Sequence, residues 1–185
     1  MSTLATKLIT ADELLRIPDD GFRYELVKGA LLRMPLNGVE HGAVTMALAS
    51  PLYQYVKAND LGKVYAAKTG FKLQSDPDTV RAPDIAFVCK RRIQETARLT
   101  GFRGGAPDLV VEVMNPDDKK RDVAEKISEY FAGGARFTWV VNPEFKTVAV
   151  YRSPLDATTL TEKDSLDGGH VVRGFQIAVA EIFAV

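Results

Sequence analysis

Two acidic residues in this sequence lie in or next to predicted buried strands, where a charged side chain is costly. Glu112 interrupts the apolar run 108–114, which predicts a central strand covered on both faces. A carboxylate inside such a strand loses hydration, so it persists only beside a cation or hydrogen-bond donors. Asp84 directly precedes a second predicted strand, 85–88. Both carboxylates are therefore candidates for chemistry.

Lys126 can supply the positive charge that Glu112 requires. Glu112 lies about 10 Å before the end of its strand, at ~3.3 Å per residue, and Lys126 lies about 12 Å into the following helix, at ~1.5 Å per residue. If the helix folds back over the strand, the two side chains meet. Two simpler interpretations stay open: Glu112 makes only a structural salt bridge, or Lys126 extends into solvent as most helical lysines do.

Asp84, Glu112 and Lys126 are together the ingredients of a magnesium-dependent phosphodiesterase. Mg²⁺ takes one or two carboxylates and keeps several waters, which leaves positions for phosphate oxygens and an attacking water. The lysine would stabilise the charge that builds up on the phosphate and orient that water.

The surrounding pattern predicts one mixed α/β domain over residues 1–185, with a central sheet and flanking helices. Helices are expected at 10–16, 40–58, 90–98 and 119–132, and strands at 22–34 (two strands), 64–73, 80–88, 108–114, 137–141, 147–152 and 171–179. Pro51 is expected to kink or break its helix. In the helix 119–132, the spacing of Val123, Ile127 and Phe131 predicts the buried stripe, with Lys126 and Tyr130 at its edge.

Composition excludes several classes of protein. Apolar residues make up 46% and charged residues 26% of the chain, which is typical of a globular domain. Lys plus Arg and Asp plus Glu number 24 each, so no overall field attracts nucleic acid or an anionic membrane. One cysteine, Cys89, and two histidines exclude an intrachain disulfide and a Cys/His zinc cluster. With no signal peptide and no long apolar run, we expect a cytoplasmic protein without a membrane segment.

Positive charge gathers locally between residues 88 and 103. Five Lys or Arg residues there, among them Lys90, Arg91 and Arg92, stand against one glutamate. This excess indicates a nucleic-acid-binding patch and a solvated helix face equally well. The sequence contains no phosphate-binding glycine motif of the nucleotide-binding folds, so nucleoside triphosphates and dinucleotides are not expected as ligands.

Several segments carry a resemblance to a known family. They are Phe22 to Val27, His41 to Val44, Arg81 to Asp84, Ala106 to Val113, and Arg121-Asp122 with Lys126 and Tyr130. In this order they resemble the Uma family of "putative restriction endonucleases", within the PD-(D/E)XK nuclease superfamily, from about residue 10 to residue 185. The resemblance implies a restriction-endonuclease-like fold and DNA as the substrate. It also implies Mg²⁺ as the cofactor, with Mn²⁺ as a substitute, held by Asp84, Glu112 and the backbone carbonyl of Val113.

The chain departs from the superfamily pattern at informative places. The superfamily has a lysine where this chain has Met114, and the Uma family instead carries a lysine on the next helix, which matches Lys126. Lys28 and Ala30 stand where that family commonly has acidic residues. Glu25 is then the one acid of its segment and an auxiliary candidate. His41 and Tyr130 match family positions as further auxiliary residues, although a histidine at a helix start is more often structural.

The sequence thus predicts a Mg²⁺-dependent endonuclease acting on DNA. We expect a homodimer, because cutting both strands of a duplex usually takes two active sites. The alternative is a non-catalytic nucleic-acid-binding or protein-interaction module that retains the fold, which the zero net charge and the changes at Lys28 and Ala30 favour. A metal-independent hydrolase that uses His41 has little support, since no nucleophile stands at a recognisable elbow.

Overall fold

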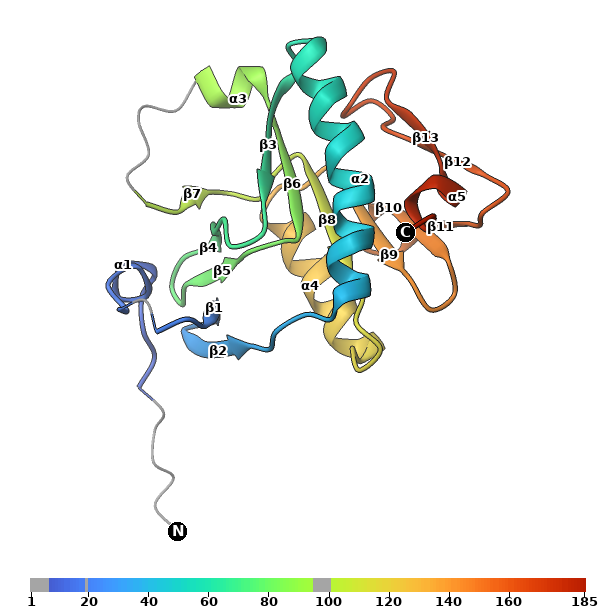
Figure 1. Ribbon diagram of the computed structural model, residues 1–185. Coiled ribbons are helices and arrows are strands. Elements are labelled where there is room, and N and C mark those ends of the chain that lie inside the picture. The colour runs from blue at the N-terminus through green and yellow to red at the C-terminus, as the bar shows by residue number, and fades with distance from the viewer. Residues whose placement is uncertain (1–6, 19, 95–100) are drawn as a thin grey trace.

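The chain forms mixed β-sheets flanked by helices (Figure 1) in a computed structural model that describes residues 7–18, 20–94 and 101–185. The helices are α1 (Ala11–Leu15), α2 (Val39–Ala58), α3 (Lys90–Gln94), α4 (Lys120–Ala132) and α5 (Val179–Ile182). The strands are β1 (Arg23–Val27), β2 (Ala30–Met34), β3 (Gly62–Ala66), β4 (Phe71–Gln74), β5 (Thr79–Arg81), β6 (Ile85–Cys89), β7 (Arg103–Gly104), β8 (Leu109–Val113), β9 (Phe137–Asn142), β10 (Thr147–Ser153), β11 (Asp156–Leu160), β12 (Ser165–Asp167) and β13 (Gln176–Ala178). The predicted mixed α/β class is confirmed.

The strands divide between two main sheets. The larger runs in the order β11-β10-β9-β8-β6-β3, the second runs β2-β1-β5-β4-β7, and β12 pairs with β13. The sequence predicts one central sheet with 64–73 and 80–88 as a hairpin, whereas β4 pairs with β5 and β3 pairs with β6. The chain changes sheets between Arg81 and Ile85, where Pro83 has no N–H to continue a ladder. Asp84 therefore lies where the two sheets meet.

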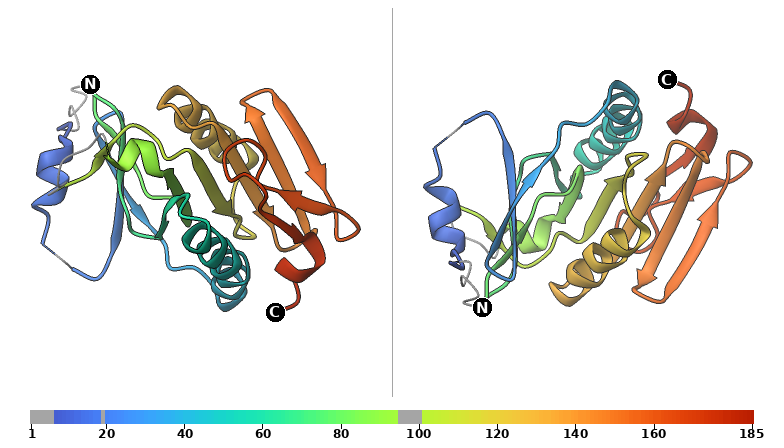
Figure 2. Two further views of the ribbon diagram at one scale, coloured as in Figure 1. Left: turned by 90° about the horizontal axis from the view of Figure 1, so that it is seen from above. Right: turned by 90° about the horizontal axis from the view of Figure 1, so that it is seen from below.

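Strand β8 lies inside the larger sheet, parallel to β9 and antiparallel to β6. Val111 and Val113 belong to the main core beneath α2, whereas Val110 packs with Tyr130 of α4. Figure 2 shows α2 and α4 on opposite faces of this strand. Since side chains alternate along a strand, Glu112 shares the α4 face with Val110. The prediction of a central strand covered on both faces is confirmed.

Helix α2 covers one face of the larger sheet. Val44, Leu48, Leu52 and Val56 recur every four residues and are all buried in the main core. Pro51 lies inside the helix and does not end it. The buried residues before and after Pro51 hold both halves against the same sheet, which offsets the cost of the missing hydrogen bond.

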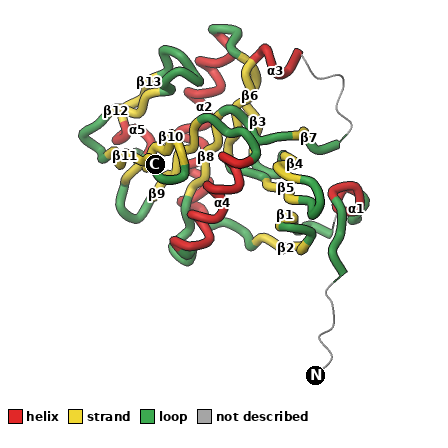
Figure 3. The backbone as a smooth tube through the Cα atoms, turned by 180° about the vertical axis from the view of Figure 1, so that it is seen from behind, coloured by secondary structure: helices red, strands yellow, loops and turns green. Residues whose placement is uncertain are grey.

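Helix α4 turns a different face to the sheet than the sequence predicts. Ile127 and Tyr130 are buried, whereas Val123 and Phe131 are only partly covered. The prediction that Tyr130 lies at the edge of the stripe is wrong, because its hydroxyl finds a carboxylate acceptor on β8 and the ring can be fully buried. Seen from behind in Figure 3, α4 lies over β8.

Two further predictions differ from the structure near the C-terminus. Only Gln176–Ala178 of the predicted strand 171–179 is a strand, because Val171 and Val172 lie in a turn that packs into the core. Strand β11 was not predicted, since it is an exposed, polar edge strand without an apolar face.

The predicted basic helix 90–98 is described as far as Gln94, and residues 95–100 lie outside the described residues. Within the described ranges, no helix has the length and apolar character needed to cross a membrane.

Candidate active site

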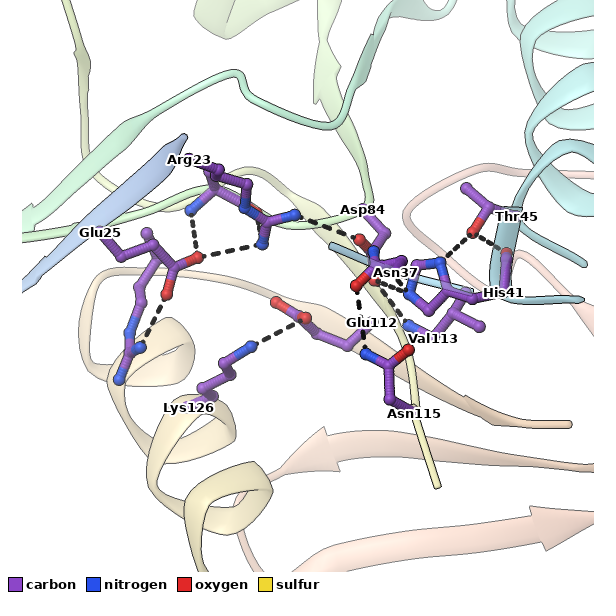
Figure 4. Close-up of polar contacts among 12 residues, drawn as sticks. Arg23, Glu25, Asn37, His41, Thr45, Asp84, Glu112, Val113, Asn115 and Lys126 are labelled. Atoms are coloured by element: carbon purple, nitrogen blue, oxygen red, sulfur yellow. Dashed lines mark hydrogen bonds and ion pairs between the residues drawn. The ribbon is translucent and has the colours of Figure 1, made fainter. Parts of the chain in front are cut away.

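Asp84, Glu112 and Lys126 come from three separate elements and line one small cavity of about 50 Å³. We call it the carboxylate cavity; it is lined by Arg23, Met34, Pro35, Asn37, His41, Asp84, Glu112, Val113, Asn115, Asp118 and Lys126. Figure 4 shows the Lys126 side chain reaching from α4 toward Glu112 on β8. The three residues that the sequence selects for phosphodiester chemistry are therefore neighbours in space.

Glu112 is held by donors from two turns of α4. The Nζ atom of Lys126 lies 3.2 Å from Oε2, and the Tyr130 hydroxyl donates to Oε1 at 2.6 Å. Burial raises the pKa of Glu112, and the nearby carboxylates of Asp84 and Glu25 raise it further, while Lys126 opposes the shift. The Glu112 charge in turn raises the pKa of Lys126. Lys126 does not extend into solvent, because its side chain is only 20% exposed.

Asp84 has the opposite electrostatic balance. Burial would raise the pKa of Asp84, but hydrogen bonds from His41 and from the backbone N–H of Val113 lower it, as do the charges of His41 and Arg23. The Val113 N–H donates to Oδ2 at 2.9 Å, which ties Asp84 to the strand that carries Glu112. Asp84 is therefore a fixed, ionised carboxylate beside a second carboxylate that is costly to ionise.

His41 lies at the first turn of α2 with its ring against Asp84. Its Nε2 atom is 3.3 Å from Oδ2 of Asp84 and 3.2 Å from Nδ2 of Asn37. Burial would lower the pKa of His41, yet the hydrogen bond and charge of Asp84 raise it, with a further contribution from the backbone of Val113. The structure thus brings His41 to the carboxylate cavity, in contact with the same groups that the resemblance assigns to a metal.

Glu25 is fully buried but is not among the described residues that line the carboxylate cavity. Its carboxylate accepts from Arg81 at 2.8 Å and from the backbone N–H of Ala82 at 3.1 Å, and it lies 3.3 Å from Arg23. Burial would raise the pKa of Glu25, but the charges of Lys126 and Arg81 lower it. In this position Glu25 orients Arg23, which itself faces the cavity.

Sequence reasoning assigned no role to Arg23. Its guanidinium lies 3.5 Å from Oδ1 of Asp84 and donates to the carbonyl of Ala82 at 2.8 Å. Its Nε is buried and finds no hydrogen-bond acceptor within the described part of the chain. One feature of the sequence could have indicated Arg23 as a site residue. It lies two residues before Glu25 in a predicted strand, where alternation places both side chains on one face.

The basic segment after β6 does not reach the carboxylate cavity. Asp84 precedes β6, whereas Lys90, Arg91 and Arg92 follow its other end on α3. Lys90 pairs with Asp60, and Arg92 lies 3.4 Å from Asp108 at the start of β8. The structure therefore separates these three cations from the cavity by the length of β6, about 17 Å at ~3.3 Å per residue.

The donor set of the cavity suits a hard cation. In the described ranges, no three His, Cys, Asp or Glu side chains are arranged as ligands of one ion. Asp84 and Glu112 nevertheless line the same cavity, and mutual repulsion contributes to the raised pKa of Glu112, which a cation between them would relieve. Two carboxylates with room for water fit Mg²⁺, which takes few protein ligands, better than a metal that needs a complete protein shell.

Comparison with known proteins identifies the family. A family model described as "Uma2: Putative restriction endonuclease" matches residues 11–180. The chain belongs to the Uma2 family. This membership supports a nuclease and DNA as its substrate. A search of curated proteins finds no significant match to the chain.

The fold of this Uma2-family chain is similar to that of a solved protein. The crystal structure of a "putative nuclease belonging to DUF820" from Anabaena variabilis ATCC 29413 superposes with a TM-score of 0.81 at 21% identity, covering 95% of this chain and 97% of that chain. The restriction-endonuclease-like class of mixed sheets flanked by helices is thereby confirmed.

Proposed function

We propose that this Uma2-family protein is a Mg²⁺-dependent endonuclease that hydrolyses DNA phosphodiester bonds at the carboxylate cavity. The observation that carries the proposal is the convergence of Asp84, Glu112 and Lys126 on one small cavity, with Lys126 Nζ 3.2 Å from Glu112. Asp84 and Glu112 would hold Mg²⁺, with the backbone carbonyl of Val113 as a further ligand. Bound Mg²⁺ supplies a Lewis acid that polarises the phosphate and favours attack by water.

The residues around the cavity have distinct tasks in this proposal. Lys126 stays protonated because Glu112 raises its pKa, so its ammonium can orient the attacking water and stabilise charge that develops on the phosphate. Asp84 stays ionised because His41, the Val113 N–H and Arg23 favour its charged form. Arg23 is 15% exposed at the cavity, so its guanidinium can donate to a phosphate oxygen. His41 and Glu25 position Asp84 and Arg23.

A metal titration followed by a cleavage assay tests the proposal. Thermal melting of the wild type is measured with Mg²⁺, Mn²⁺ or a chelator, and each metal is expected to raise the melting temperature. Asp84→Asn should lose this shift, while Asp156→Asn, which changes an exposed aspartate on the edge strand β11, should keep it. The same proteins are then incubated with plasmid, linear duplex and single-stranded DNA under each condition.

We expect metal-dependent cleavage by the wild type and by Asp156→Asn but not by Asp84→Asn. Metal binding through Asp84 without cleavage of any DNA form would refute nuclease activity. A protein with no metal-dependent melting shift and no cleavage would be a non-catalytic module that retains the fold, the alternative that the sequence left open.

A further inference from the structure

A larger pocket of about 350 Å³ opens beside the carboxylate cavity. We call it the adjoining pocket. It shares His41, Asn115 and Asp118 with the carboxylate cavity, so the two hollows lie next to each other. Its volume lies in the range of sites that enclose small organic groups. A substrate bound at the carboxylates can therefore place a neighbouring group in this pocket.

The walls of the adjoining pocket carry exposed apolar side chains. Val39 is 93% exposed and Phe145 is 67% exposed, and both line the pocket together with Met114 and Pro143. A single exposed apolar residue is ordinary, but two exposed and two half-buried apolar residues around one concavity next to a candidate active site indicate a binding surface. The ligand group that this lining favours is flat or apolar.

Phe145 is held in a defined place relative to the carboxylates. Its backbone N–H donates to Oδ1 of Asn142 at 3.1 Å, and the Asn142 side chain contacts the sulfur of Met114 at 3.5 Å. Met114 lies two residues beyond Glu112, about 7 Å at ~3.3 Å per residue, which is within the span of one nucleotide. Through these two contacts of Asn142, the turn that carries Phe145 is held next to the chain segment that carries Glu112.

The charges of the adjoining pocket argue against a phosphate as its occupant. Glu40, Asp118 and Glu144 line it against the single lysine Lys120. A phosphate group would meet this acidic excess, whereas a nucleobase is neutral and can stack on an aromatic ring. Stacking of a base on an aromatic side chain contributes ~1–3 kcal/mol. Asn115 adds an amide for hydrogen bonding at the boundary with the carboxylate cavity.

We infer that the adjoining pocket binds an unpaired base next to the phosphate that is cleaved, with Phe145 as its stacking platform. This inference rests on the proposed function and names the substrate class: single-stranded or locally unpaired DNA. In a paired duplex the base is stacked inside the helix, and bringing it into the pocket costs a few kcal/mol. The protein should therefore prefer DNA strands whose bases are free.

Binding measured without metal tests the inference independently of catalysis. Fluorescence anisotropy in chelator follows three labelled probes: a single strand, the same strand with abasic sites, and its duplex. The wild type should bind the single strand most tightly, and Phe145→Ala should weaken that binding by about tenfold, the equivalent of ~1.4 kcal/mol. Phe145→Tyr should restore it. Leu155→Ala, which changes a side chain that is 99% exposed on the β10–β11 hairpin, should bind as the wild type does.

The wild type and Phe145→Ala should bind the abasic strand with equal affinity, because neither complex can contain a base stacked on Phe145. Equal affinity of the wild type for single strand and duplex, or no effect of Phe145→Ala on the single strand, would overturn the base pocket while leaving metal-dependent cleavage untouched. A wild type that binds none of the three probes would also overturn it. Absence of cleavage on every DNA form would refute the proposed function instead, and the anisotropy result would still decide the pocket.

Discussion

Replacement of Lys126 by methionine distinguishes a catalytic lysine from a structural one. The substitution keeps most of the apolar stem and removes the ammonium that lies 3.2 Å from Oε2 of Glu112. At an effective dielectric constant of ~20, two unit charges at that separation attract by about 5 kcal/mol. Breaking a buried pair by removing one partner costs ~3–5 kcal/mol, because the other charge stays buried. For a domain of this size, that corresponds to a fall in melting temperature of roughly 6–20 °C.

The stability loss of Lys126→Met should depend on pH. The pKa of Glu112 is already raised by burial and by neighbouring carboxylates, and Lys126 is the charge that opposes the shift. When a carboxyl group has a higher pKa in the folded state than in the unfolded state, the protein becomes less stable as the pH rises from the unfolded-state pKa through the folded-state pKa. The difference in melting temperature from the wild type should therefore shrink as the pH falls and Glu112 becomes protonated.

The catalytic role predicts a second, separate effect of Lys126→Met. Loss of one group that stabilises charge in the transition state costs ~3 kcal/mol, or about a hundredfold in rate. Single-turnover cleavage is measured below the melting transition of the variant and is expressed per folded molecule. Metal binding should persist or strengthen, because a competing positive charge is gone.

Lys7→Met is the matched control for the Lys126 experiment. Lys7 pairs with Glu13 at 3.3 Å, but the two side chains are 82% and 41% exposed, so solvent screens the pair. Its loss should change stability by no more than about 1 kcal/mol and leave the cleavage rate unchanged. A large stability loss in Lys126→Met with an unchanged rate per folded molecule would refute the catalytic assignment of Lys126.

Three other expectations can be tested separately. Asp84→Asn should lower the melting temperature above the unfolded-state pKa of Asp84, because the hydrogen-bond partners and charges around Asp84 favour its ionised form; an unchanged melting temperature would contradict this. Tyr130→Phe removes a buried hydrogen bond of 2.6 Å to a carboxylate and should reduce the free energy of unfolding by ~1.5–3 kcal/mol in urea titrations, and an unchanged midpoint would count against it. We expect a homodimer, so light scattering should give twice the 20.3 kDa mass of one chain, and a mass near 20.3 kDa at micromolar concentration would exclude the dimer.

The sequence by itself determined the strand of Glu112, and it predicted the contact between Glu112 and Lys126 on the condition that the helix folds back over that strand. Both depend on regularities that are local in the chain. A continuous apolar run predicts a buried strand, and the rise per residue of strand and helix fixes how far each side chain lies from the turn between them. Lys126 follows Glu112 by fourteen positions, so the chain has to fold back only once, with α4 over β8, to place Lys126 Nζ 3.2 Å from Glu112 Oε2.

Only the tertiary structure decided the rest of the site. Arg23 lies on β1 of the second sheet, and Asp84 lies in the link through which the chain passes from that sheet to β6 of the larger one. The change of sheet around Pro83 brings their side chains together, and no periodicity in the sequence indicates it. Tyr130 is buried because a carboxylate on another element accepts from its hydroxyl, so hydrophobic spacing along α4 placed it wrongly at the edge. Lys90, Arg91 and Arg92 are close together in the sequence and so form a candidate patch. In the structure they follow β6 and lie at the end of that strand opposite to Asp84. Contacts between distant segments are set by packing and by satisfaction of buried polar groups, and neither quantity is a property of spacing along the chain.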